Sequence, residues 1–338
     1  MAASLVSFIG ILLLVIPALA HTRHVIIPNA PDLHPVSLAW DPNAQHFLVG
    51  SRLRPAISSI SDAGVVETLI SDELHPQGSF IAAVAIDAPR RRLLAALANP
   101  PALAAYDLQS RRQHTRIFSS PLPDDPAALA VDHATGDVFV TLGNFIYKID
   151  LEGKASIFSE SRVYGSEAPL EGVAHVSRGF LLVAQGGTGA VFKVDDEMGA
   201  AKTGLAARWG GRAPGPGGAG IAVRSDGSAV MVAGSKVRAV RSEDGWGEAA
   251  VVDEVSVEGV AMGVTVREGR KAYVLVGEKD EDGGISGSKF RIEEVEWGSD
   301  GEGDMLVPMV LLALGFAYFL YWRFQMGQLA SSLNKKRA

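Results

Sequence analysis

Apolar and polar positions follow one pattern six times along this chain: an apolar run, a tight turn often carrying Asp or Gly, and a second apolar run. These second runs begin at Phe47, Leu93, Val138, Phe180, Val230 and Tyr273. The steps between them are 46, 45, 42, 50 and 43 residues. Four short strands in each such period are typical of a β-propeller. The pattern therefore predicts an all-β fold, a six-bladed β-propeller, with a two-sheet β-sandwich as the alternative.

The third unit shows the pattern most clearly. Apolar runs at 128–131 and 138–142 flank the turn Asp132–Asp137, and two further runs at 145–149 and 155–158 complete the unit. Asp in such a turn caps backbone N–H groups, and Gly136 can take a positive φ. The unit is therefore predicted to form one four-stranded blade.

The sixth unit has only three apolar runs, at 260–266, 273–276 and 290–295. Near the other end of the chain, His24–Ile27 is an apolar, β-branched run without a unit of its own. We predict that this N-terminal strand is the outer strand of the last blade and closes the ring. The propeller then covers residues 21–297.

Residues 1–20 are predicted to be a signal peptide. The apolar run 5–15 is too short to span a bilayer comfortably, Pro17 interrupts it, and Ala18-Leu19-Ala20 supplies a small-residue cleavage site. The alternative is an uncleaved signal anchor.

A second apolar segment, residues 305–322, contains no charged residue and ends in aromatic side chains. At about 1.5 Å per residue, a helix of this length spans roughly 27 Å, close to the thickness of an endoplasmic reticulum bilayer. The acidic linker 298–304 precedes it, and Arg323 begins a basic tail, 323–338. By the positive-inside rule, the segment is predicted to be the transmembrane helix of a single-pass type I membrane protein with a cytosolic tail.

The tail ends with Lys335 and Lys336, three and four positions from the C-terminus. Two lysines at these positions resemble the di-lysine retrieval signal that coat proteins read on proteins of the endoplasmic reticulum. A basic flank that arose by chance is the alternative. The sequence thus predicts residence in the endoplasmic reticulum membrane and coat proteins as partners.

Composition narrows the classes of protein. The chain has 338 residues, a formal charge of −7 and no cysteine, so a lumenal domain must fold without disulfides. No stripe of Lys and Arg with interleaved aromatic residues occurs, and this argues against a nucleic-acid partner. The basic run Arg90–Arg92 lies in a predicted hairpin and is interpreted as a solvated turn.

Three carboxylates are candidates for chemistry. Asp125, Glu171 and Glu258 lie just before the predicted inner strands of the third, fourth and sixth blades. Inner strands of a propeller begin around one mouth of the central channel, so the three side chains are expected to converge there. Carboxylate oxygens are the ligands that Ca²⁺ prefers, and a metal site is one interpretation. Solvated loop acids are the other.

Short motifs resemble a known family. Glu-Gly-Val-Ala at 171–174 and 258–261, together with 129–140, is similar to six-bladed propellers of the SMP-30/gluconolactonase/LRE-like type, in the calcium-dependent phosphotriesterase superfamily. The NHL and strictosidine-synthase-like groups are similar in the same way. The resemblance implies a Ca²⁺ cofactor and hydrolysis of lactones or phosphotriester-like esters. Only Glu171 or Glu258 matches the family's metal-binding Glu, the following Pro is absent, and no Asn stands at a matching position.

The family's catalytic set is therefore largely missing, and no catalytic residue is assigned. We expect a membrane-anchored binding or scaffolding module that takes a protein or small-molecule ligand at the mouth of the channel, with no certain cofactor. The alternative is a calcium-dependent hydrolase with a degenerate metal site.

Overall fold

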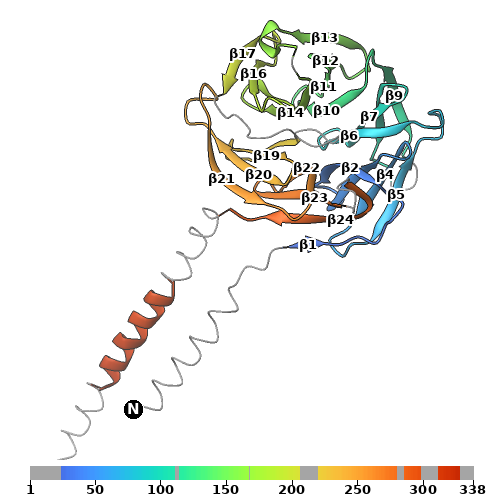
Figure 1. Ribbon diagram of the computed structural model, residues 1–338. Coiled ribbons are helices and arrows are strands. Elements are labelled where there is room, and N and C mark those ends of the chain that lie inside the picture. Colours follow the sequence, from blue (N-terminus) through green and yellow to red (C-terminus); the bar gives the residue numbers. More distant parts are fainter. Residues whose placement is uncertain are drawn as a thin grey trace, which may run out of the picture. The chain divides into compact units, whose positions relative to one another are not determined.

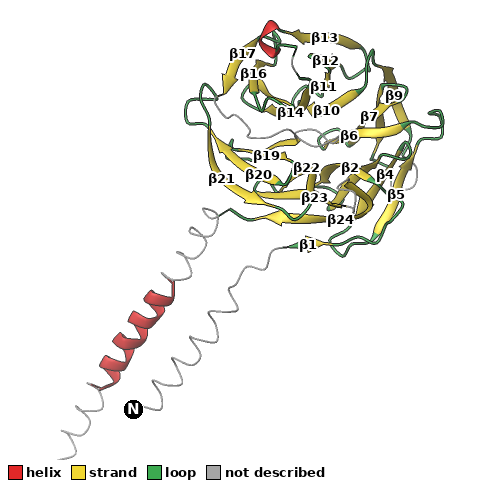
Figure 2. Cartoon of the chain, viewed as in Figure 1, coloured by secondary structure: helices red, strands yellow, loops and turns green. Residues whose placement is uncertain are grey.

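The computed structural model describes residues 24–110, 114–166, 168–205, 220–279, 285–297 and 311–327. The chain divides into two compact units, Met1–Val295 and Glu296–Ala338. The first unit is almost entirely β-structure, with a 3-10 turn, η2, at Arg162–Tyr164 (Figure 2).

Six four-stranded antiparallel sheets form a ring in the first unit (Figure 1). Blade 1 contains β2 (Pro35–Asp41), β3 (His46–Ser51), β4 (Ala56–Ile60) and β5 (Val66–Ser71). Blade 2 contains β6 (Phe80–Asp87), β7 (Arg92–Ala98), β8 (Ala102–Asp107) and β9 (Arg116–Pro121). Blade 3 contains β10 (Pro126–Val131), β11 (Val138–Leu142), β12 (Phe145–Ile149) and β13 (Ala155–Glu160).

The remaining blades repeat this order. Blade 4 contains β14 (Leu170–Val176), β15 (Phe180–Gln185), β16 (Val191–Asp195) and β17 (Ala201–Leu205). Blade 5 contains β18 (Gly220–Val223), β19 (Ala229–Ala233), β20 (Lys236–Arg241) and β21 (Ala250–Ser256). Blade 6 contains β22 (Val260–Arg267), β23 (Lys271–Lys279), β24 (Ile285–Val295) and β1 (Val25–Ile26). The prediction of an all-β, six-bladed propeller is confirmed.

The ring closes where the two ends of the propeller sequence meet. β1 pairs antiparallel with β24, Val25 opposite Glu293 and Ile26 opposite Ile292, and the Glu294 N–H donates to the His24 carbonyl at 2.8 Å. Ile26 is only 2% exposed. The predicted closing strand is therefore confirmed as the outer strand of blade 6.

Apolar residues on both faces of the blades fill the spaces between neighbouring sheets. One buried cluster joins Ala39 and Ile57 of blade 1 to Ile81, Leu93 and Tyr106 of blade 2. Gly50 makes this approach possible, because a Cβ atom there would lie 2.3 Å from Ile81 Cγ2. Burial on both faces explains why strands such as β7 read as continuous apolar runs rather than alternating ones.

The interpretation of Arg90–Arg92 as a solvated turn is wrong for Arg92. Its side chain is 7% exposed and donates through Nε and Nη2 to Asp87 Oδ2, at 3.1 and 2.7 Å. Nη2 also donates to the Gly136 carbonyl of the blade 3 hairpin at 2.9 Å. A buried guanidinium needs such partners to offset its desolvation, so this arginine links blade 2 to blade 3.

Of the second unit, the structure describes residues 296–297 and the helix 311–327, which extends past Trp322, the predicted end of the apolar span. Among the described residues, no helix is both long and apolar enough to cross a membrane. Several predicted features lie outside the described residues: the signal peptide 1–20, the linker 298–304, the first part of the apolar span at 305–310, and the lysines Lys335 and Lys336.

The closure of the ring predicts an unequal response to two neighbouring substitutions. Ile26→Ala removes a buried side chain from the closing strand and should lower the free energy of unfolding by about 2–5 kcal/mol. Ile27→Ala is the matched control: Ile27 is 74% exposed, and its loss should change stability by less than about 0.5 kcal/mol. Urea denaturation followed by tryptophan fluorescence measures both. Equal effects of the two substitutions would contradict a stabilising role for β1.

Candidate functional site at the mouth of the channel

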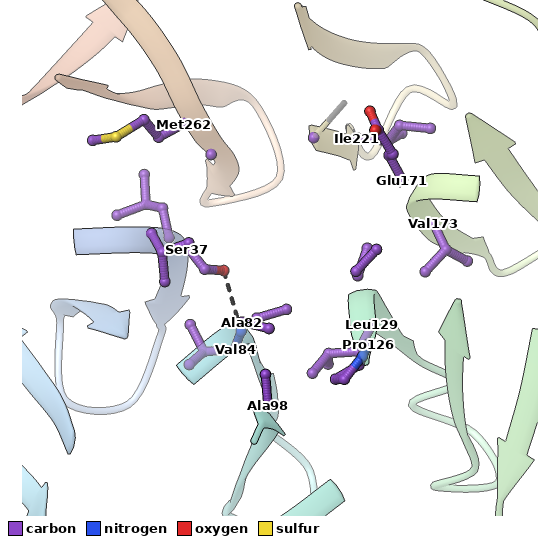
Figure 3. Close-up of a pocket in the computed structure, with 18 of the residues that line it drawn as sticks. Ser37, Ala82, Val84, Ala98, Pro126, Leu129, Glu171, Val173, Ile221 and Met262 are labelled. Atoms are coloured by element: carbon purple, nitrogen blue, oxygen red, sulfur yellow. Dashed lines mark hydrogen bonds between the residues drawn. The ribbon is translucent and has the colours of Figure 1, made fainter. Parts of the chain in front are cut away.

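The six inner strands, β2, β6, β10, β14, β18 and β22, each pack against the next around the central channel. Residues at or near the beginning of all six line one cavity of about 320 Å³. Most of its wall is apolar, and Val84, Leu129, Val173, Ile221 and Met262 face it from five blades (Figure 3). The cavity occupies the mouth of the channel, where a propeller can present side chains from every blade to one ligand.

A recurring backbone feature shapes this cavity. Near the beginning of five inner strands, as far as the structure describes them, the pairing with the second strand shifts by one residue, as at a β-bulge. A bulge leaves its extra residue outside the hydrogen-bonded ladder and re-aims its side chain. The residues in these shifts all line the cavity: Val36 and Ser37 in β2, Ala82 in β6, Ala127 in β10, Glu171 in β14 and Met262 in β22. We call them the bulge residues.

Ser37 shows how a bulge residue also joins two blades. Its hydroxyl oxygen accepts a hydrogen bond from the Val84 backbone N–H of blade 2 at 3.1 Å (Figure 3). The hydroxyl thus satisfies a backbone donor that a β-ladder would otherwise occupy. The bulge in β2 is therefore held in place from the neighbouring blade.

Charged groups lie on opposite sides of the cavity. Arg52, which follows β3 of blade 1, lines it, and so do Asp125 beside blade 3 and Glu171 in blade 4. Blades 1 and 4 are opposite each other in a ring of six, so the guanidinium and the Glu171 carboxylate come from opposite walls. Burial lowers the pKa of Arg52 below its ordinary value, because the charged form loses water.

Glu171 packs closely against the backbone at the end of β15. A Cβ atom at Gly186 would lie 2.0 Å from Glu171 Cδ, so only glycine leaves room for the carboxylate in this position. Figure 3 shows the carboxylate beside Ile221 of the next blade. The side chain is half-buried, whereas Asp125 is exposed at the rim.

The structure brings Asp125 and Glu171 together but leaves Glu258 out of the cavity lining. Glu171 is the extra residue at the bulge of β14, and Met262 is the extra residue at the bulge of β22. Met262 is therefore the structural counterpart of Glu171. Glu258 lies four residues earlier and is exposed, and its backbone carbonyl accepts a hydrogen bond from Arg291 at 2.7 Å. The repeated Glu-Gly-Val-Ala motif therefore occupies two different positions in its two blades.

The metal-binding capacity of the mouth follows from this placement. Within the described ranges, no group of three or more His, Asp or Glu side chains lies close enough to hold a metal ion. Ca²⁺ takes six to eight oxygen ligands, of which Asp125 and Glu171 supply only part. The arrangement instead suits a ligand with an apolar body and one or more charged groups.

Of the bulge residues, only Glu171 was predicted from the sequence as a site residue, and Arg52 was not predicted either. An extra residue in a strand becomes visible only when its partner strand is known, and a single sequence does not fix that register. Arg52 reads as an ordinary loop arginine after an apolar strand. An Arg directly after the second strand of a blade nevertheless indicates a site residue. The second strand is antiparallel to the inner strand, so it ends near the mouth of the channel.

Comparisons with known proteins support the fold. No family profile and no curated protein matches the chain. Among solved structures, the major allergen Mala s 1 of Malassezia sympodialis matches with a TM-score of 0.63 and 14% identity over 82% of this chain and 97% of that chain. A streptogramin B lyase matches with a TM-score of 0.58 and 12% identity over 81% and 98%. The WD40 β-propeller domain of Doa1 matches with a TM-score of 0.54 and 14% identity over 78% and 80%.

At these identities the likeness shows the propeller fold alone. The neighbours include a lyase and a WD40 domain, so the same scaffold carries different functions. The resemblance to the SMP-30/gluconolactonase family stays a prediction.

Proposed function

We propose that the propeller is a binding module that holds a small-molecule ligand at the mouth of its channel. The observation that carries this proposal is the cavity of about 320 Å³ built by bulge residues from five blades. Ligand sites in proteins are typically concave and mostly apolar, with a few polar groups that orient the ligand, and begin at roughly 300 Å³. The cavity matches this description in size and in lining.

The lining indicates how a ligand would be held. Leu129, Val173 and Ile221 offer an apolar wall that gains free energy by removing ligand surface from water. Arg52 on one side and Glu171 on the other would orient the charged groups of the ligand. Because these side chains come from rigid strands or their ends, the ligand would meet a largely preformed site.

Blocking the cavity should abolish binding. Ala82→Trp places an indole in the cavity from β6, so fragments that raise the melting temperature of the full-length protein in nanodiscs should no longer do so. Ala250→Trp is the matched control, because Ala250 is exposed on the outer strand β21 and its substitution leaves the cavity unchanged. A thermal-shift screen of a fragment library measures all three proteins. If no fragment discriminates the wild type and the control from Ala82→Trp, the proposal is wrong.

The calcium-dependent hydrolase is the second candidate, and Asp125 and Glu171 in one cavity are the observation in its favour. A bound ion at one hundred times its dissociation constant stabilises a protein by about 2.7 kcal/mol. A binding module without such a site should keep its melting temperature within about 1 °C when EDTA replaces Ca²⁺. Loss of a bound ion would instead lower the melting temperature by several degrees, because one kcal/mol corresponds to a few degrees in a domain of this size.

A drop of several degrees on chelation would support the hydrolase if it disappears in Glu171→Gln and persists in the matched control Glu258→Gln. Differential scanning calorimetry of the full-length protein distinguishes these outcomes.

We also propose that residues 305–322 anchor the propeller to the endoplasmic reticulum membrane as a type I protein. What supports this is the uncharged sequence of the segment, the helix that covers its described part from 311 onward, and the basic residues that follow it. Coat proteins would read the terminal lysines as a retrieval signal.

Replacing the two lysines tests this location. The double variant Lys335→Ser, Lys336→Ser should move the protein from the endoplasmic reticulum toward the cell surface, because it removes the charges that a coat protein would bind. Surface biotinylation of cells that express each form measures the shift. Arg337→Ser, which removes one tail charge but keeps both lysines and Arg323, is the control. Equal retention of the wild type and the double variant would refute the signal.

A further inference from the structure

A second cavity, of about 300 Å³, lies beside the first. The two cavities share Val36, Arg52 and Met262 in their walls. The second is further lined by His34, Leu53, Ile285 and Gly287, at the junction of blade 1 with blade 6. The shared residues place the two cavities side by side, with Arg52 in the wall of both.

His34 occupies an unusual conformation at this junction. Its φ of 46° lies in the left-handed region, which residues other than glycine adopt rarely and at some energetic cost. The Arg52 backbone N–H donates to the His34 carbonyl at 3.0 Å and so fixes the position of the turn. The strained backbone directs a half-buried imidazole to the wall of the second cavity.

Gly287 makes room for that imidazole. A Cβ atom at this position would lie 1.6 Å from His34 Nδ1. The pairing of β24 with β23 is irregular next to Gly287, between the pairs of Gly277 and Lys279. The irregular pairing of β24, the glycine at 287 and the left-handed backbone of His34 thus place its imidazole in the wall of the cavity that Arg52 also lines.

We propose that the second cavity is a subsite for a carboxylate group of the ligand, held by the Arg52 guanidinium and the His34 imidazole. This inference rests on the proposed function, because the apolar body of the same ligand would lie in the first cavity. A guanidinium carries five N–H donors in a planar fork that matches a carboxylate, so it can accept the ligand beside the contacts it already makes. The partial burial of Arg52 strengthens an ionic hydrogen bond relative to one in water.

The charge of the surroundings favours a carboxylate over a phosphate. Among the described lining residues of both cavities, Arg52 is the one side chain with a permanent positive charge, and no lysine accompanies it. Asp125 and Glu171 on the far side of the first cavity place two negative charges within the same site. A singly charged anion meets less repulsion there than a doubly charged one.

Three probes with one apolar body test the subsite: phenylbutyrate, phenylbutanol and phenylbutyl phosphate. Isothermal titration calorimetry of the full-length protein in nanodiscs at pH 7 should show phenylbutyrate binding about tenfold or more tightly than phenylbutanol, as expected for a charge-assisted hydrogen bond. Arg52→Gln should remove this advantage without changing the affinity for phenylbutanol, and Arg52→Lys should retain part of it. Gly287→Ala should reduce the advantage by displacing the imidazole.

Four other results would each overturn a different statement about the site. Equal affinities for phenylbutyrate and phenylbutanol would overturn the carboxylate subsite and leave the binding module intact. Tightest binding of the phosphate would overturn the choice of carboxylate. An equal loss of all three affinities in Arg52→Gln would assign the arginine a purely structural role and overturn the inference. Absence of binding by all three probes to the wild type would overturn the subsite and count against the binding module itself.

Discussion

The pairing of β1 with β24 is the contact on which the rest of the propeller depends. It joins residues 25–26 to residues 292–293, so the two ends of the propeller complete one sheet. Without cysteines, no covalent bond can close this ring. Closure therefore rests on backbone hydrogen bonds and on the burial of Ile26 against neighbours such as Phe47 and Tyr273. The neighbouring cavity at the junction of blades 1 and 6 exists only because these blades are held together.

The repeat pattern was sufficient to predict the blades, their number and the closing strand. Apolar runs such as β7 made the pattern easy to recognise, because burial on both faces of the strand requires consecutive apolar residues. Prediction failed where the register or a partner decided the outcome. Arg92 reads as a turn residue, yet its pairing with Asp87 buries it. Glu258 shares a motif with Glu171, yet four residues separate it from the equivalent position in its blade.

The opposite charges of Arg52 and Glu171 would make a mostly apolar pocket selective among ligands. Arg52 and Glu171 lie on opposite blades, and a largely apolar wall separates them. In such surroundings, charges interact over longer distances than they do in bulk solvent. A ligand whose charges match this polarity gains orientation as well as affinity, and one with reversed polarity meets repulsion at both ends.

The bulge residues carry a consequence for how this protein could change over evolutionary time. Apart from Ser37, whose hydroxyl joins blade 1 to blade 2, these residues stand outside the hydrogen-bonded ladders of their strands. Their side chains can therefore be exchanged with little effect on the pairing that holds each blade. Alanine at Ala82 and Ala127, glutamate at Glu171 and methionine at Met262 already stand at equivalent positions of one scaffold. The mouth thus resembles a ring of independently variable positions. Ligand preference could drift there while the selection that maintains the fold acts on other residues.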